Sequence, residues 1–473
     1  MTDPWRVPPA GLALAAGIFA SATLPGRSFG LAWTIVIWMV LAAVAVRYAS
    51  ELGWFERSCL SAAALLGAAF TIRGAKWLLA IDVLAVGGLA IASALPVSTW
   101  RSLVSGPAGF VWGLARGAAF VLRPWLGWAV RLSERRAVVF RSSALVALLL
   151  AVFGALFFSA DAAFASLAER FLVPDLDLGL LPARVLLGSI VVAGAGSLLV
   201  LRERETVVSP WRLAEGTNRF RLARGEWISA LVAVDLLFAV FVTVQLGVLF
   251  GGHTRVLETA GLTYAEYARE GFFQLVVVAI LTLGLMAAVV RSGETGESGP
   301  RSMRLLLGAL CLLTLVVLVS AFTRMNLYQA AFGYTRARIL VDVTIIWLAA
   351  LFVALIVAGV RWQGEWLPRA VVALSAVTIL GLNLYNPDAR IASMNIARSE
   401  RTGDLDLYVL ADLGPDAVPA LMGLKDPART CLLASMQGRL EGQRSLWSFN
   451  LARDEARGLL EDRRSASQGA LTC

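Results

Sequence analysis

Residues 262–291 have the sequence LTYAEYAREGFFQLVVVAILTLGLMAAVVR, and this stretch decides the class of fold. From Phe272 to Val290 its only polar side chains are those of Gln274 and Thr282. An apolar helix of about 20 residues, rising about 1.5 Å per residue, is long enough to cross a hydrocarbon core of about 30 Å. The stretch therefore predicts a membrane-spanning helix.

The residues that lead into this helix are polar and form two rows. Side chains at intervals of three or four residues share one face of a helix. The first row is Tyr264, Tyr267, Gly271 and Gln274, and the second is Glu266 and Glu270. We therefore expect a polar entry to this span.

The composition of the whole chain is that of a membrane protein. Hydrophobic residues make up 58% of the 473 positions and charged residues only 16%, whereas soluble domains carry about 25% charged residues. Apolar runs recur along the chain and predict further transmembrane helices. A soluble globular protein is therefore excluded.

We predict an all-α multispan helical membrane protein of about 11 transmembrane helices with a small C-terminal helical domain. The predicted spans are residues 8–24, 29–46, 58–72, 77–95, 143–158, 181–201, an entry at 224–227 continuing to 250, 264–290, 303–322, 339–360 and 367–384. Four regions follow: N-terminal transmembrane hairpins (1–95), a basic segment (96–142), a transmembrane core bundle (143–385) and a soluble helical C-terminal domain (386–473).

The basic segment 96–142 interleaves four tryptophans with seven arginines, with glycine and proline breaks between them. Amphipathic segments of this kind lie in the head-group plane of a bilayer rather than across it. Two interpretations stay open. The segment is an interfacial linker held on the cytoplasmic side by its positive charge, or it is a dedicated site for anionic lipids or a partner.

The net charge of +9 comes almost entirely from arginine. Much of it lies in loops between spans, which favours lipid head groups and topology over nucleic acid as the explanation. Arginines are concentrated in alternate loops, and cytoplasmic loops hold such an excess. We therefore expect a cell-membrane protein with a cytoplasmic N-terminus, and an odd number of spans then places the C-terminal domain outside the cytoplasm.

Cysteine and histidine give no indication of a metal or redox site. The four cysteines form no CxxC pair, and the single histidine, His253, excludes sites that need two or three imidazoles. The chain also lacks the GxxxxGK[ST] loop of P-loop ATPases and the commonest hydrolase motifs. We expect no metal and no cofactor, and carboxylates are the ionisable groups left for chemistry.

Three stretches carry a resemblance to a known family: YAEYAREGFF in the quoted segment, NPDARIASMNIAR after the last span, and DLDLYVLADLGPDAVPAL beyond it. They resemble an uncharacterised family of bacterial polytopic membrane proteins, a domain of unknown function of the 4153/4173 type. The resemblance implies a membrane bundle followed by a short helical domain. That family has no established chemistry, so the resemblance implies no reaction or ligand.

In this topology the polar residues near three span ends fall on the outer side of the membrane, and we call them the outer polar cluster. Its predicted members are Tyr264, Glu266, Tyr267, Glu270, Gln274, Arg324, Asn326, Arg336, Arg338, Asp342, Asn383 and Asp388. Arg338 and Asp342 are four residues apart, so we expect them to pair on one helix. The cluster either locks neighbouring spans together or forms a ligand or catalytic site.

Two carboxylates, Asp82 and Asp235, lie inside predicted spans. A carboxylate in lipid costs several kcal/mol unless it is paired or faces water. These residues are therefore candidates for interhelical hydrogen bonding or for a proton or ion pathway.

The function that the sequence favours is a non-enzymatic envelope scaffold or sensor, in which the outer polar cluster and the C-terminal domain engage a lipid, peptide or protein partner. The first alternative is a transporter or flippase that uses the intramembrane aspartates. The second is a membrane transferase acting on a lipid-linked substrate, with Glu266, Glu270 or Asp342 as the base.

Overall fold

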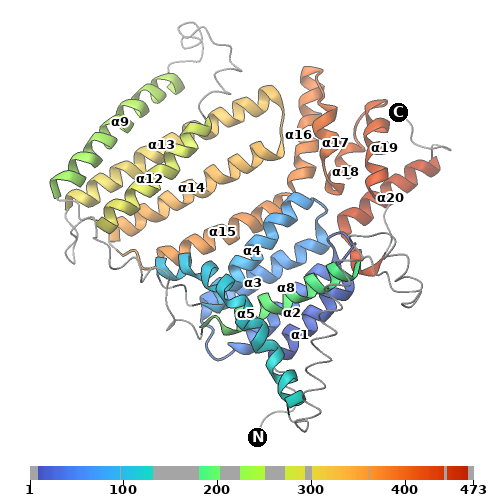
Figure 1. Ribbon diagram of the computed structural model, residues 1–473. Coiled ribbons are helices and arrows are strands. Elements are labelled where there is room, and N and C mark those ends of the chain that lie inside the picture. Colours follow the sequence, from blue (N-terminus) through green and yellow to red (C-terminus); the bar gives the residue numbers. More distant parts are fainter. Residues whose placement is uncertain are drawn as a thin grey trace, which may run out of the picture. The chain divides into compact units, whose positions relative to one another are not determined.

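The structure is a computed structural model, and it describes residues 9–95, 97, 99–130, 180–202, 224–250, 272–292, 301–361, 363–440 and 445–466. Every regular element in these ranges is a helix, as Figure 1 shows, which confirms the all-α prediction. The chain divides into two compact units, which are described separately below. Unit 1 contains residues 1–208 and 441–457, and unit 2 contains residues 209–440 and 458–473.

Within the described ranges, six helices are long and apolar enough to cross a membrane: α3 (Trp54–Ile72), α4 (Lys76–Ala94), α8 (Leu181–Val200), α13 (Arg301–Phe332), α14 (Arg336–Arg361) and α15 (Leu367–Tyr385). Shorter apolar segments lie in α1 (Pro9–Thr23), α2 (Leu31–Arg47), α9 (Arg224–Phe250) and α12 (Phe272–Ser292). The chain is an integral membrane protein of the multispan helical class. The predicted span 143–158 lies outside the described residues, so the count of about 11 stays a prediction.

Helix α8 contacts α1, α2, α4 and α5 and forms the centre of unit 1. Its final carbonyls are held by Tyr48, whose hydroxyl lies 3.0 Å from the carbonyl oxygen of Leu198 and 2.8 Å from that of Leu199. Just beyond α8, Arg202 pairs with Glu51 at 2.9 Å. Since the last carbonyls of a helix have no intrahelical partner, these contacts satisfy the end of α8 and fix it beside the end of α2.

The basic segment forms one continuous helix, α5 (Trp100–Val130), which packs against α8. A Cβ at Gly117 would lie 2.1 Å from the backbone nitrogen of Ser197, so the two backbones approach as closely as glycine allows. The Ser197 hydroxyl donates to the Phe110 carbonyl at 2.7 Å. The prediction of glycine breaks in residues 100–130 is therefore wrong, because this glycine lies in a helix contact.

Unit 2 is built around α13, which contacts α9, α12 and α14. Figure 1 shows α13 and α14 running side by side. The core between these helices includes the fully buried side chains of Trp227, Leu310, Leu318 and Phe352. Burial of large apolar side chains inside the bundle leaves other apolar residues of the same helices exposed, as expected where lipid is the solvent.

Beyond α15 the chain forms short helices: α16 (Pro387–Thr402), α17 (Leu407–Asp412), α18 (Val418–Leu421), α19 (Ala428–Leu440) and α20 (Leu451–Ala466), with 3-10 turns at Pro415–Ala417 and Leu446–Ser448. Asn386 separates α15 from α16 in a left-handed conformation, with φ of 52°, and Pro387 then starts α16. The predicted domain boundaries stay predictions. Of the described residues from 386 onward, 445–457 belong to unit 1.

Candidate functional site

The turn between α13 and α14 is built around Gly333. This residue has φ of 81°, and a Cβ there would lie 2.6 Å from Oδ1 of Asn395. The Asn395 side chain, on α16, accepts from the Tyr334 N–H at 2.8 Å and donates to the Tyr334 carbonyl at 2.9 Å. The Asn395 amide thus binds both the N–H and the carbonyl of Tyr334 and fixes α16 against the turn.

Two arginines bind the C-terminal end of α13. Arg398 donates to the carbonyl of Ala331 at 2.6 Å, and Arg338 donates to the carbonyl of Phe332 at 2.9 Å and to that of Gly333. The last carbonyls of a helix lack intrahelical partners and carry the negative end of its dipole, so guanidinium groups stabilise them. These arginines act as a helix cap.

Arg336, at the start of α14, joins two segments of the C-terminal region. Its Nε and Nη2 donate to both carboxylate oxygens of Asp388 at 2.9 and 2.7 Å, and its Nη1 donates to the Asp412 carboxylate at 2.7 Å. Asp388 also accepts from the Gly414 N–H at 2.7 Å. The side chain of Asp388 is fully buried, whereas that of Asp412 is 71% exposed. We call Arg336, Asp388 and Asp412 the Arg336 clamp.

The predicted pair of Arg338 and Asp342 is absent from the described structure. Asp342 instead accepts from Nε2 of Gln329 at 2.6 Å. The Arg338 guanidinium lies 4.3 Å from the ring centroid of Tyr328 and donates to the carbonyls at the end of α13. The prediction was wrong because Arg338 binds the free carbonyls at the C-terminal end of α13 instead of Asp342. Residue spacing along α14 cannot reveal these carbonyls.

The cluster therefore connects elements of the fold. Arg336 joins α14 to α16 and to the end of α17, Arg398 joins α16 to α13, and Asn395 holds the turn between α13 and α14. Charge-assisted and bidentate hydrogen bonds of this kind fix geometry strongly. Across the described ranges, no group of three or more His, Cys, Asp and Glu side chains is arranged to hold a metal ion.

The other predicted members of the outer polar cluster are more scattered. Gln274 on α12 and Asn326 on α13 are exposed, and Arg324 is partly buried. Asn383 is buried, and its Nδ2 donates to the Ile379 carbonyl of its own helix at 3.1 Å. Tyr264, Glu266, Tyr267 and Glu270 lie outside the described residues. The structure thus brings together Arg336, Arg338, Asp342 and Asp388 around one turn.

The two intramembrane aspartates belong to different units. Asp82 on α4, in unit 1, is completely buried. Asp235 on α9, in unit 2, has both carboxylate oxygens buried, and no described residue donates a hydrogen bond to them. Their role stays a prediction.

Sequence reasoning missed Asn395, Arg398 and Asp412. The signal for two of them was present, because Asp388, Asn395 and Arg398 follow one another at seven and three residues and so share one face of α16. That face also contains the buried Ile391. Polar residues in register with a buried apolar residue indicate a buried polar contact.

Comparison with known proteins agrees with the membrane fold. Residues 60–424 match the family described as Domain of unknown function (DUF4153). This protein belongs to that family. The DUF4153 match confirms the resemblance drawn from sequence, and its range includes the Gly333 turn and the Arg336 clamp. No curated protein and no solved structure matches the chain.

Proposed function

We propose that this protein is a non-enzymatic envelope scaffold or sensor, in which the C-terminal helices engage a lipid, peptide or protein partner. The observation that carries the proposal is the Arg336 clamp. In it Arg336, the first residue of a membrane helix, donates four hydrogen bonds to Asp388 on α16 and Asp412 at the end of α17. Asp388 also accepts from the Gly414 N–H. A helical region held this firmly is suited to presenting a surface at a fixed position.

The use of charge in the cluster supports this function over a catalytic one. Arg336 and Arg398 bind acceptors of the fold, whereas groups that stabilise a transition state are aimed at reacting atoms. Three acidic residues are candidate bases for a transferase, and Asp342 is the one that lies in the described residues. Its carboxylate accepts a hydrogen bond from Gln329. These contacts favour a structural role for the cluster.

We further propose that the C-terminal region is extracytoplasmic. Its support is the arginine bias of the loops. Reporter fusions test this placement. We expect position 215 to report the cytoplasm and position 400 the opposite side, and a cytoplasmic position 400 would contradict the assignment.

A transporter is the second candidate, and Asp235 favours it. Its carboxylate oxygens are buried in a membrane bundle, and no described residue hydrogen-bonds to them. Carboxylates in this setting commonly belong to ion or proton pathways. A transporter would require the charge of Asp235, whereas a scaffold would not.

Complementation of a deletion strain separates the two functions. We would compare Arg336→Met, which removes the clamp, with Asp235→Asn, which removes the intramembrane charge at nearly constant volume. The control is Arg401→Gln, because Arg401 is exposed on α16. Membrane abundance of each variant is measured by immunoblot.

The scaffold predicts that Asp235→Asn and Arg401→Gln complement fully while Arg336→Met does not. Asp412→Lys provides a milder test of the same clamp if Arg336→Met lowers abundance, since Asp412 is 71% exposed. A normally abundant Asp235→Asn variant that fails to complement, beside clamp variants that succeed, would overturn the scaffold and favour transport.

A further inference from the structure

Residues 445–457, which we call the tail segment, pack on the loop that follows α1 in unit 1. The Leu31 N–H donates to the Phe449 carbonyl at 3.0 Å. Arg453 donates to the Ser28 hydroxyl at 2.7 Å and to the Phe29 carbonyl at 2.8 Å. This loop connects two apolar helices, so the tail segment is held at the level where such helices leave the hydrocarbon and meet lipid head groups.

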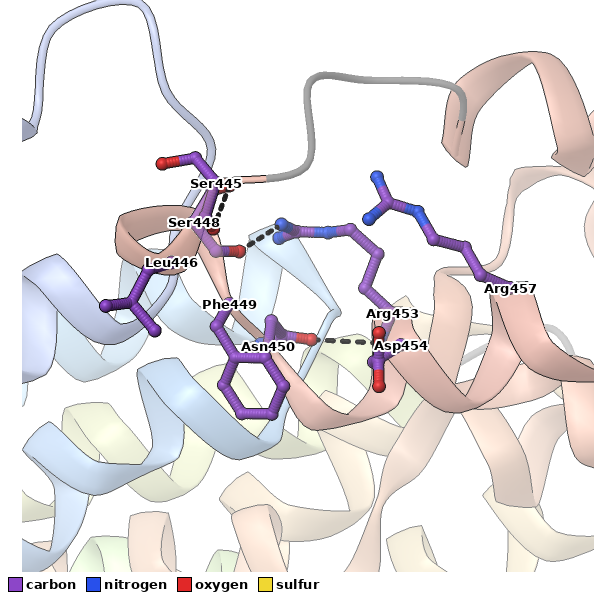
Figure 2. A pocket seen from close by; sticks show the side chains of 8 residues that line it. All are labelled: Ser445, Leu446, Ser448, Phe449, Asn450, Arg453, Asp454 and Arg457. Atoms are coloured by element: carbon purple, nitrogen blue, oxygen red, sulfur yellow. Dashed lines mark hydrogen bonds between the residues drawn. The ribbon is translucent and has the colours of Figure 1, made fainter.

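A pocket of about 340 Å³ opens within the tail segment. Ser445 and Ser448 line one side of it, and Arg453 and Arg457 line the other (Figure 2). The two arginines are four residues apart on α20, so they share a face of that helix. Figure 2 shows both arginine side chains extending toward the same side, and Asp454 also lines the pocket.

Among the described residues, no carboxylate pairs with the Arg453 guanidinium group. Three of its N–H groups bind neutral oxygens, those of the Ser28 hydroxyl and of the Ser448 and Phe29 carbonyls. Burial, and then the neighbouring charge of Arg457, lower the pKa of Arg453 from its ordinary value. An anion placed beside both guanidinium groups would be attracted by each of them and would offset their mutual repulsion.

The apolar side chains of Leu446 and Phe449 line this pocket, and Leu451 follows in the same segment. Leu446 is 67% exposed, Leu451 is 52% exposed and Phe449 is 40% exposed. Exposed leucine and phenylalanine beside arginine are typical of segments that lie in a membrane interface, with apolar groups among acyl chains and cations on head groups. A soluble phosphate would make no use of these three side chains.

We infer that the pocket of the tail segment binds the phosphate of an anionic phospholipid head group. Arg453 and Arg457 would bind the phosphate oxygens, and Leu446, Phe449 and Leu451 would contact the acyl chains. Guanidinium groups match phosphate geometry well. This site goes beyond the scaffold proposal, which rests on the Arg336 clamp in unit 2, so either can fail without the other.

Lipid titration of the full-length protein tests the site. The protein is purified in a neutral detergent, and its thermal unfolding is followed with added phosphatidylglycerol, with phosphatidylcholine, or with inorganic phosphate at equal ionic strength. We expect phosphatidylglycerol to stabilise the wild type most. Inorganic phosphate that reproduces its full effect would overturn the lipid assignment and indicate a soluble phosphate compound.

Matched variants locate the effect. Arg457→Gln should weaken the apparent affinity for phosphatidylglycerol about tenfold, the usual order for losing one charged hydrogen-bonding group. Arg401→Gln removes the same charge from an exposed position on α16 and should leave the affinity unchanged. Equal affinities for the wild type and both variants would overturn the proposal.

A second measurement does not depend on the folding of Arg457→Gln. A photo-reactive phenylalanine analogue in place of Leu446, in an otherwise unchanged chain, should form an adduct with phosphatidylglycerol that mass spectrometry detects. Failure to form a lipid adduct at this exposed position, while a control at exposed Leu384 of the membrane bundle forms one, would overturn the site.

Discussion

The two units attach a C-terminal segment to a turn between membrane helices in similar ways, but they treat charge differently. In each unit a buried asparagine binds backbone groups of the turn. Asn395 binds the N–H and carbonyl of Tyr334 in unit 2, and Asn450 donates to the Phe70 and Arg73 carbonyls at the C-terminal end of α3 in unit 1. Each adds an arginine. Arg336 binds two carboxylates, whereas Arg453 binds neutral oxygens.

We use this difference to distinguish a structural contact from the binding site that we infer. In unit 2 the charge of Arg336 is neutralised within the fold, so it contributes stability and leaves little potential for a ligand. In unit 1 the described partners of Arg453 are neutral oxygens, and Arg453 lies with Arg457 in the lining of a pocket. The predictions below test this contrast, from the largest expected effect to the smallest.

Arg336→Met should have the largest effect on stability. It leaves the fully buried Asp388 carboxylate without its cation, and breaking a buried pair in this way costs about 3 kcal/mol or more. Unfolding of the purified protein in detergent measures the loss. A cost below about 1 kcal/mol would show that the pair behaves like an exposed one.

Asn395→Ala and Asn450→Ala test the feature that the units share. Both side chains are buried. Asn395 makes two hydrogen bonds with the Tyr334 backbone, and Asn450 makes three, with the Phe70 and Arg73 carbonyls and the Arg453 N–H. We expect each substitution to cost about 2 kcal/mol, measured by the same unfolding assay. A large cost for only one of them would contradict the parallel between the units.

Asp412→Asn should lower the free energy of unfolding by less than about 1 kcal/mol, although Asp412 binds the same arginine as Asp388. Its side chain is 71% exposed, so water and salt screen the pair. The difference between variant and wild type should shrink further in roughly 1 M salt. A cost equal to that of Arg336→Met would mean that burial does not determine the strength of the clamp.

Asp426 provides the smallest effect and a pH dependence. Hydrogen bonds from Arg429 and then Thr430, together with the charges of Arg429 and Arg463, hold the pKa of this exposed carboxyl well below its usual range. A carboxyl whose pKa is lower in the folded than in the unfolded state stabilises the fold at pH values above its unfolded pKa, which is about 3.9 for Asp. This stabilisation is lost as pH falls from there through the folded pKa.

Asp426→Asn should therefore lower the unfolding temperature slightly at neutral pH. The difference from wild type should decrease as pH falls below about 4. Thermal unfolding at a series of pH values measures it. A difference that grows toward acid would reverse the sign and refute the interpretation.

The membrane helices could be predicted from sequence because each depends on local information. The run from Phe272 to Val290 is apolar throughout, and in lipid such a run satisfies its own backbone only as a helix. The sequence did not predict that α5 is continuous, because glycine has two opposite effects. It weakens an isolated helix, but it also lets two helices approach closely. Gly117 takes the second role only because Gly196 lies opposite it.

The polar cluster shows a similar limit. Sequence identified Arg336, Arg338, Asp342 and Asp388 as members, because charged residues at the ends of apolar runs are conspicuous. It assigned Arg338 the wrong partner and did not pair Gln329 with Asp342, because these hydrogen-bond partners lie on different helices. Residue spacing along one helix shows which side chains share a face. It does not show which other helix or turn packs against that face.

By itself the sequence determined the class of protein, the family and the apolar membrane helices in the described ranges, because hydrophobic length and helix propensity act over neighbouring residues. Only the tertiary structure decided which charges are neutralised and which are retained. That outcome depends on contacts such as Arg336 with Asp388, 52 residues apart, and Arg453 with Phe29, 424 residues apart. Electrostatic pairing follows distance in space, which the fold alone sets.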